Sequence, residues 1–409
     1  MKKESEQLHT VVIIGAGAAG LMAAGSLANC RVTVLERNEK AGKKLYISGK
    51  GRCNVTNDCT PDEFLKHVVR NPKFLYSAVY GFTPEDMQTL LHACGVPTKT
   101  ERGNRVFPAS DKASDVTRAL MRRAEKNGAD IRYNTRVTRV RKTDDGFAVQ
   151  TDGETYLCEK LLIATGGKSY PATGSTGDGY AFARSLGHTV TPPRPSLVPF
   201  VTEENFSELA GLTLKNVAVR LEAGNRMYTE FGELLFTHNG VSGPTVLRLS
   251  AYVAELVMPM RLYIDLKPAL DNETLDKRIT SDFTVNANKQ LKNALDMLLP
   301  QALILPVLLR SGLSPDKKAN VCTRSERQQL VHTVKNFPCN VVATEPLENA
   351  IVTAGGVDVR EVDPKTMQSK ICPDLYFAGE VLDVDALTGG FNMQIAFATA
   401  QAAAKAIRA

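Results

Sequence analysis

The stretch that decides the fold is Thr10-Val11-Val12-Ile13-Ile14-Gly15-Ala16-Gly17-Ala18-Ala19-Gly20. Its first five residues form a continuous apolar run, which is typical of a strand buried on both faces. The G-x-G-x-x-G turn follows, and residues 21–28 then read as a helix of small side chains. Residues 31–36 are a second strand that ends in Glu36. This order predicts a β-α-β unit with parallel strands and a helical crossover.

The glycine turn has the composition of a dinucleotide-binding site. Gly15 permits a tight turn, Gly17 lets the backbone approach a pyrophosphate, and Gly20 lets helix and strand pack closely. The start of the helix offers unbonded N–H groups and a positive dipole to the phosphates. Glu36 can accept hydrogen bonds from the ribose hydroxyls and would repel a 2′-phosphate. NAD and FAD both fit this pattern.

Three further features favour FAD. Residues 49–54 form a glycine-rich loop soon after the ribose carboxylate, and residues 163–167 form a second strand-to-glycine turn. Residues 377–380 form a third such turn, followed by 389–392 and an alanine-rich helix. Together these segments can line an extended ligand with a second ring system. NAD dehydrogenases need no C-terminal strand that returns to the first site, so the chain is predicted to bind FAD non-covalently.

Composition and charge narrow the class of protein. The chain has 409 residues, too many for one core, with 43% hydrophobic and 23% charged residues, as in soluble globular proteins. The net charge is +6 with scattered cations, so we expect no nucleic-acid partner. The eight cysteines form no C-x-x-C pair, and no metal is expected. The N-terminal segment 1–6 is charged and residues 295–309 are broken by prolines, which predicts a cytoplasmic protein without membrane contact.

Domain organisation follows from a proline cluster at 192–199 and from the return of strand and glycine patterns near the C-terminus. We predict an α/β fold with a Rossmann-like, doubly wound FAD-binding domain interrupted by a β piece and a helical piece. Residues 130–140 and 147–157 alternate like a separate small sheet. The expected boundaries are 1–192 and 349–409 for the FAD-binding domain, 193–267 and 331–348 for the inserted β domain, and 268–330 for the helical domain.

The sequence also resembles a known family, the HI-type bacterial flavoproteins, which include aminoacetone-oxidase-like and bile-acid 4,6-reductase-like enzymes. The matching motifs are residues 41–45, 48–57, 170–179, 235–244, 352–357, 366–370 and 379–385. The resemblance covers essentially the whole chain. It implies FAD, a β-barrel-like insert and a small helical domain, but no single substrate. One departure is Ala386, where the family pattern has Gly, and this stiffens the turn before Gly389.

The residues expected to contact the cofactor lie in the three glycine turns and their flanks. They are Gly15, Gly17, Ala18, Ala19, Gly20, Glu36, Arg37, Lys44, Gly51, Arg52, Cys53, Asn54, Val137, Ala164, Thr165, Gly166, Gly379, Glu380, Gly390, Phe391, Asn392 and Gln394.

Three residues are candidates for catalysis. Arg52 either stabilises negative charge at the N1–C2=O edge of reduced flavin or anchors its own loop. Cys53 is a candidate redox thiol, although no partner cysteine lies two or three residues away. His238 is either a proton donor or a hydrogen-bonded structural residue. The glycine-rich segment 237–244 around it is expected to cover the substrate side of the flavin.

The function predicted from these features is an FAD-dependent oxidoreductase that moves hydride between flavin N5 and a small or medium organic substrate. NAD(P)H and oxygen are both candidate redox partners. The sequence has no second G-x-G-x-x-G, so a nicotinamide donor would share the substrate cleft. Two alternatives stay open: an FAD-dependent enzyme that modifies nucleic acid such as tRNA, and a flavin-binding redox sensor without turnover. Oligomeric state is not predicted.

Overall fold

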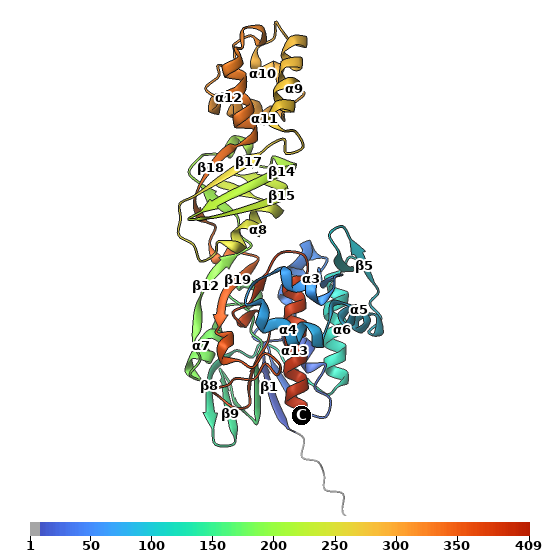
Figure 1. Cartoon of the computed structure of the whole chain (residues 1–409). Helices are drawn as coiled ribbons and strands as arrows, with labels where there is room; N and C mark the ends of the chain where they lie inside the picture. The colour runs from blue at the N-terminus through green and yellow to red at the C-terminus, as the bar shows by residue number, and fades with distance from the viewer. Residues whose placement is uncertain (1–8) are drawn as a thin grey trace, which may run out of the picture. The chain divides into compact units, whose positions relative to one another are not determined.

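The computed structural model describes residues 9–409, which form two compact units (Figure 1). The first contains residues 9–196 and 347–409, and the second contains residues 197–346. Both parts of the chain with FAD-type motifs therefore belong to one unit, into which the other is inserted. The charged N-terminal segment lies outside the described residues.

A five-stranded parallel sheet forms the centre of the first unit. The order of its strands is β20 (Leu375–Phe377), β11 (Lys160–Ile163), β1 (Thr10–Ile14), β2 (Arg31–Leu35) and β7 (Asp130–Arg132). The apolar run of β1 is central because it pairs with β2 on one side and with β11 on the other. The strand order reverses direction at β1, as in doubly wound folds, whose ligands bind outside the carboxyl ends of the strands at this point. The predicted fold class is confirmed.

One strand differs from the prediction. Residues 130–132 were expected in a separate small sheet, but they pair in parallel with β2 at the edge of the central sheet. A three-residue edge strand has the same alternation as a strand of a hairpin, so the pattern alone does not assign it to a sheet. The separate antiparallel sheet contains only β8 (Val137–Thr143), β9 (Gly146–Thr151) and β10 (Thr155–Cys158).

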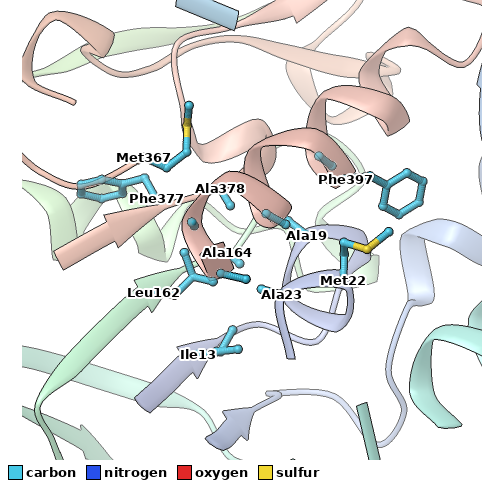
Figure 2. Packing of buried hydrophobic residues seen from close by; sticks show 14 of the residues in the cluster. Ile13, Ala19, Met22, Ala23, Leu162, Ala164, Met367, Phe377, Ala378 and Phe397 are labelled. Atoms are coloured by element: carbon cyan, nitrogen blue, oxygen red, sulfur yellow. The ribbon is translucent and has the colours of Figure 1, made fainter. Parts of the chain in front are cut away.

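Helices with small side chains pack close to the glycine turn. Helix α1 (Ala18–Ala24) packs against the 18-residue helix α13 (Phe391–Arg408). Figure 2 shows part of this core, with Met22 of α1 and Phe397 of α13, both fully buried. The other helices of the unit are α2 (Lys43–Ile47), α3 (Pro61–Lys66), α4 (Pro72–Gly81), α5 (Pro84–Ala93), α6 (Ala113–Lys126) and α7 (Asp178–Ser185).

Short sheets connect segments that are distant in the sequence. A three-stranded antiparallel sheet has the order β3 (Thr56–Asn57), β6 (Arg105–Pro108) and β5 (Thr98–Glu101). Strand β4 (Val68–Arg70) pairs with β21 (Asp385–Ala386), and β12 (Val190–Ser196) pairs with β19 (Val352–Val357).

Strand β12 explains where the first unit ends. It contains three of the prolines that suggested a domain boundary at 192/193, and its pairing with β19 is irregular between Thr191 and Arg194. Because proline lacks an N–H donor, it interrupts this ladder without ending it. The strand therefore stays with the first unit, and the unit boundaries lie at 196/197 and 346/347.

A closed barrel and five α-helices around one hydrophobic core make up most of the second unit. The barrel order is β13 (Phe200–Thr202), β16 (Gly240–Ser242), β15 (Arg226–Thr237), β14 (Thr213–Ala223), β17 (Met260–Asp265) and β18 (Phe337–Thr344). Helix α8 (Pro244–Tyr252) follows β16, and the later helices are α9 (Asn272–Val285), α10 (Leu291–Ala294), α11 (Gln301–Arg310) and α12 (Arg324–Lys335). Leu303, Val307 and Leu308 share a buried cluster with Leu262 of the barrel. The helical segment thus has no separate core, and it continues to Lys335.

Candidate functional site

The glycine turn joins β1 to α1 at the carboxyl edge of the central sheet. Gly15 has φ +103°, and a Cβ there would lie 2.7 Å from the Ala164 carbonyl oxygen. A Cβ on Gly20 would lie 1.8 Å from the Gly15 carbonyl oxygen, so close packing requires both glycines. Beside Gly17 a Cβ would meet no described atom within 4 Å. The turn therefore adjoins open space where the backbone can approach a ligand.

The start of α1 has the features of a phosphate site. Gly17 is its N-cap and supplies no side-chain cap, and Ala18 and Ala19 lie in the first turn. The first N–H groups of a helix have no intrahelical partner and point along the positive end of the dipole. Two phosphates of a dinucleotide fit this arrangement.

Glu36 lies beside this turn, as the sequence predicted. Its Oε2 accepts a hydrogen bond from the Ala16 N–H at 2.8 Å, and its Oε1 accepts hydrogen bonds from Asn38 N and Nδ2 at 2.9 and 2.7 Å. The carboxylate is buried and oriented by these donors. Each oxygen still has lone pairs for a ribose hydroxyl.

Arg37 and Val137 flank Glu36. Arg37 Nη1 pairs with Asp178 Oδ2 at 3.0 Å at the start of α7. Val137 is buried at the start of β8, and the Thr135 N–H near it donates to the Glu36 carbonyl at 2.8 Å. These members of the predicted cofactor-contacting set therefore lie together.

The second and third glycine turns converge on the first. The Ala164 N–H donates to the Ile14 carbonyl, and the Ala378 N–H donates to the Ile163 carbonyl. A Cβ on Gly379, which has φ +78°, would lie 3.1 Å from the Ala19 Cβ. Thr165 and Gly166 follow β11 at the same edge, and Figure 2 shows Ala164 and Ala378 with Ala19 in one view.

A partly buried ion pair holds this edge together. Lys44 Nζ lies 2.7 Å from Glu380 Oε2 and 2.7 Å from Ser169 Oγ. Glu380 Oε1 also accepts hydrogen bonds from Thr353 N at 2.8 Å and from Ser169 Oγ at 3.2 Å. Burial opposes ionisation of Glu380, but the charge of Lys44 and these hydrogen bonds keep its pKa below the ordinary value. Glu380 is thus a fixed anion at the strand ends.

The start of α13 contributes a second helix N-terminus. Gly390 is its N-cap with φ +99° and no side-chain cap. Asn392 Oδ1 accepts from Ala386 N at 2.9 Å, and its Nδ2 donates to the Ala386 carbonyl at 2.7 Å, so the loop before the helix is fixed even with alanine at 386. Phe391 and Gln394 are buried, and Gln394 Nε2 donates to the Phe82 carbonyl at 2.9 Å. These contacts leave the helix start itself available for a carbonyl group of a flavin ring.

Contacts of the Arg52 side chain anchor the loop 49–54. Arg52 makes hydrogen bonds to both oxygens of Glu101, at 2.8 and 3.2 Å, and its guanidinium lies 4.1 Å from the centroid of Phe107. These contacts are the ones expected if Arg52 anchors its own loop. Gly51 has φ +85°, and Asn54 follows with a buried Oδ1.

Cys53 has none of the features of a reactive thiol. It is fully buried, and burial raises the pKa of its thiol to about 12 although a hydrogen bond with Ser48 acts the other way. Near neutral pH the group is protonated, whereas redox and nucleophilic cysteines react as thiolates. The burial and raised pKa of Cys53 therefore argue against a role for its thiol in catalysis.

His238 lies in the second unit. It is an exposed residue of the turn between β15 and β16, and Gly240 with φ +157° follows it. A Cβ on Gly240 would lie 2.2 Å from the Phe200 carbonyl oxygen, so the glycine pattern here is required by the barrel itself. The role of His238 as a proton donor stays a prediction.

A buried ion pair in the segment before α13 was not predicted from the sequence. Asp385 is fully buried, with Arg70 Nη1 2.8 Å from its Oδ1 and Ser196 Oγ 2.7 Å from its Oδ2. Burial raises the pKa of Asp385 to about 6, although Arg70 and Ser196 act in the opposite direction. The two aspartates at 383 and 385 in an otherwise apolar segment were the available signal, but the partner lies 315 residues away.

Within residues 9–409, no group of three His, Cys, Asp or Glu side chains is placed to hold a metal ion. In the same residues, no helix combines the length and apolar character needed to cross a bilayer.

Comparison with known proteins identifies the family. Residues 9–406 match the HI0933-like protein Rossmann domain. The chain belongs to this family. The predicted family and fold are thus confirmed, and with them the class of flavoprotein oxidoreductase.

Three relatives that match this chain over nearly its whole length have two kinds of name. This chain is 36% identical over 404 residues to a ribosomal RNA dihydrouridine synthase of Escherichia coli K12, and the match covers 96% of both chains. This chain is 34% identical over 406 residues to the protein of that name in Haemophilus influenzae, and the match covers 97% of this chain and 98% of that one. A 3-dehydro-bile acid delta(4,6)-reductase of Clostridium scindens is 30% identical over 407 residues, covering 98% and 99%. Relatives named for ribosomal RNA leave the expectation of no nucleic-acid partner unconfirmed.

A solved structure shares the fold at low identity. The 3-ketosteroid-delta4-(5alpha)-dehydrogenase of Rhodococcus jostii RHA1 superposes with a TM-score of 0.53 at 15% identity, over 99% of this chain and 98% of that one.

Proposed function

We propose that this protein is an FAD-dependent reductase that converts uridine to dihydrouridine in ribosomal RNA. The observation that carries the proposal is the match to two ribosomal RNA dihydrouridine synthases over nearly the whole length of both chains. The first unit supports a flavin cofactor for this reaction. It offers two helix starts without side-chain caps, and the buried carboxylate of Glu36, proposed to bind a ribose, lies at the same edge of the sheet. This replaces our expectation of a small substrate.

The residues present fit FAD. The open space beside Gly17 and the start of α1 suit the pyrophosphate, Glu36 suits the adenosine ribose, and the start of α13 suits the polar edge of the ring. When bound, FAD supplies the hydride for the reduction, and NAD(P)H is the proposed source of the electrons. The chain itself must hold the cofactor, orient the uracil and deliver one proton.

The reaction saturates the C5=C6 bond of uracil, which is conjugated to the C4 carbonyl. A hydride adds to C6, a proton adds to C5, and the two electrons come from the nicotinamide donor. Delivery of the proton needs a general acid, and His238 is the proposed donor because histidine side chains commonly act in this role. Cys53 is not suited, because it is fully enclosed.

A second candidate is a reductase of a steroid-like dienone, supported by the 30% identity to the bile-acid reductase. Both names describe the reduction of a carbon–carbon double bond conjugated to a carbonyl, so one flavin site can serve either substrate. The two differ in size and charge, because RNA carries a phosphate on each nucleotide.

Anaerobic reoxidation of the reduced flavin distinguishes the two candidates. The protein is reduced with NADPH or NADH and mixed with either ribosomal RNA from an E. coli strain that lacks its own synthase or a 3-oxo-delta(4,6) bile acid. The proposal predicts rapid reoxidation by the RNA and slow reoxidation by the bile acid. The opposite order would support the steroid-type reductase.

A further inference from the structure

A small antiparallel sheet beside the start of α13 has an excess of cations over carboxylates. The sheet β3–β6–β5 and its adjoining loops cover residues 48–58 and 97–112, which we call the basic sheet. The basic sheet contains six Lys or Arg residues and three carboxylates. It therefore carries half of the net charge of +6 of the whole chain.

Three of these cations are used in ion pairs. Arg52 and Lys99 both pair with Asp111, at 3.3 and 2.5 Å, and Arg52 and Arg105 both pair with Glu101, at 2.8 and 4.0 Å. The third carboxylate, Asp58, accepts a hydrogen bond from Thr100 Oγ1 at 3.2 Å. Even this paired group has more cations than Glu101 and Asp111 can neutralise.

The other three cations are exposed. They are Lys50, Arg102 and Lys112, and within residues 9–409 none has a carboxylate within ion-pair distance. Lys50 holds a left-handed backbone conformation with φ 59°, which glycine or asparagine adopts with less strain.

Hydrogen bonds connect the basic sheet directly to the start of α13. Asn57 Nδ2 donates to the Gly103 carbonyl in the β5–β6 turn and to the Gly389 carbonyl, both at 3.0 Å. Gly390, the N-cap of α13, lies against the backbone of Thr56 so closely that a Cβ would be 2.2 Å from the Thr56 carbonyl oxygen. Exposed cations and the proposed position of the flavin ring therefore belong to one connected part of the first unit.

We infer that Lys50, Arg102 and Lys112 bind the phosphates of the RNA strand that carries the target uridine. This inference rests on the proposed function and adds the surface that holds its substrate. Phosphate contacts position a nucleic acid without reading its sequence, and exposed Lys and Arg are the residues that make them. A bile acid has one anionic group and does not need three separated cations. The basic sheet therefore fits RNA better than it fits the second candidate.

The test replaces the three cations and compares RNA binding. The variant is Lys50→Gln/Arg102→Gln/Lys112→Gln, and the probe is a short fluorescein-labelled RNA hairpin with a uridine-rich loop, titrated by fluorescence anisotropy at several salt concentrations. The matched control removes the same charge elsewhere in the first unit, with Arg139→Gln/Arg141→Gln/Lys365→Gln, all exposed positions. FAD content and flavin reduction by NAD(P)H are measured in both variants to establish that the cofactor site is intact.

The expected result is selective. Each phosphate contact on single-stranded RNA contributes a salt slope of about 0.7, so losing three should weaken binding by roughly 100-fold near 0.1 M salt and lower the slope by about 2. The control variant should bind like the wild type. Equal RNA affinity of the two variants, with a wild type that still forms dihydrouridine, would overturn this inference and leave the proposed function standing. A wild type that forms no dihydrouridine would instead refute the proposed function.

Discussion

Lys44 and Glu380 lie 336 residues apart in the sequence, yet Lys44 Nζ is 2.7 Å from Glu380 Oε2. The pair joins the N-terminal β-α-β unit to the C-terminal glycine turn at the edge where the cofactor is proposed to bind. Ser169 and the Thr353 N–H complete the coordination of the carboxylate. The two parts of the first unit are thus joined by charge as well as by the sheet.

Replacing Lys44 should destabilise the protein in a pH-dependent way. Lys44→Met leaves the partly buried Glu380 carboxylate without its cation, at a cost of about 1–3 kcal/mol of unfolding free energy. The pKa of Glu380 is lowered in the folded state, so the stability it contributes is present above its ordinary pKa and is lost as the pH falls through the folded value. The loss in Lys44→Met should therefore be largest near neutral pH.

Urea unfolding of the apoprotein, followed by circular dichroism, measures this effect. The control is Lys44→Met/Glu380→Gln, which removes both charges and should recover most of the lost stability. An equal loss in the single and double variants would contradict the account of the pair.

Glu36→Ala should weaken FAD binding. A charged acceptor of ribose hydroxyls contributes about 1–3 kcal/mol, which corresponds to roughly 5- to 150-fold in Kd. Titration of the apoprotein with FAD by fluorescence quenching gives the value. Glu39→Ala is the matched control, since its carboxylate is exposed and pairs with Lys43. If the two variants bound FAD equally well, Glu36 would not contact the ribose.

Asp385 should make the folded state more stable in mild acid. Its pKa is raised by burial to about 6 in the folded protein, from an ordinary value of 3.8. The folded state thus binds the proton more tightly, and stability falls as the pH rises from about 4 to 6. Asp385→Asn lacks this titration. Between pH 4.5 and 7 the unfolding free energy of the variant should therefore improve relative to the wild type by about 2 kcal/mol. A pH-independent difference in urea unfolding would rule out the raised pKa.

His238→Asn tests the proposed proton donor. If His238 supplies the proton, the variant keeps its FAD and its reduction by NAD(P)H, while turnover falls by about 10²–10⁴. His332→Asn is the control, because His332 is an exposed histidine of α12 in the same unit. Unchanged turnover of a flavin-loaded His238→Asn protein would exclude the catalytic role.

The local part of this architecture was predictable from the sequence. The glycines at 15 and 20 are required by contacts shorter than any side chain permits, and such constraints leave a strict pattern in the sequence. The apolar run of β1 is equally clear, because a strand buried on both faces cannot alternate. Glu36 was found because its position is set by the end of the second strand.

Long-range relationships were not predictable in the same way. The edge strand β7 has the same alternation as a hairpin strand, and only its pairing with β2 assigns it. The Asp385–Arg70 pair depends on the pairing of two short strands, β4 and β21, that lie far apart in the sequence. Arg52 was left between two roles, because whether a loop cation binds a ligand or its own loop depends on Glu101 and Phe107, which are distant in sequence.

The most direct test of the account is nucleoside mass spectrometry of ribosomal RNA. RNA from an E. coli strain without its own synthase is incubated with the FAD-loaded protein and NADPH or NADH, digested and analysed for dihydrouridine. The account predicts dihydrouridine at a defined uridine, dependent on the nicotinamide donor and absent with Glu36→Ala protein that has lost its FAD. Ribosomal RNA without dihydrouridine, from a protein whose flavin is fully reduced by the donor, would contradict it.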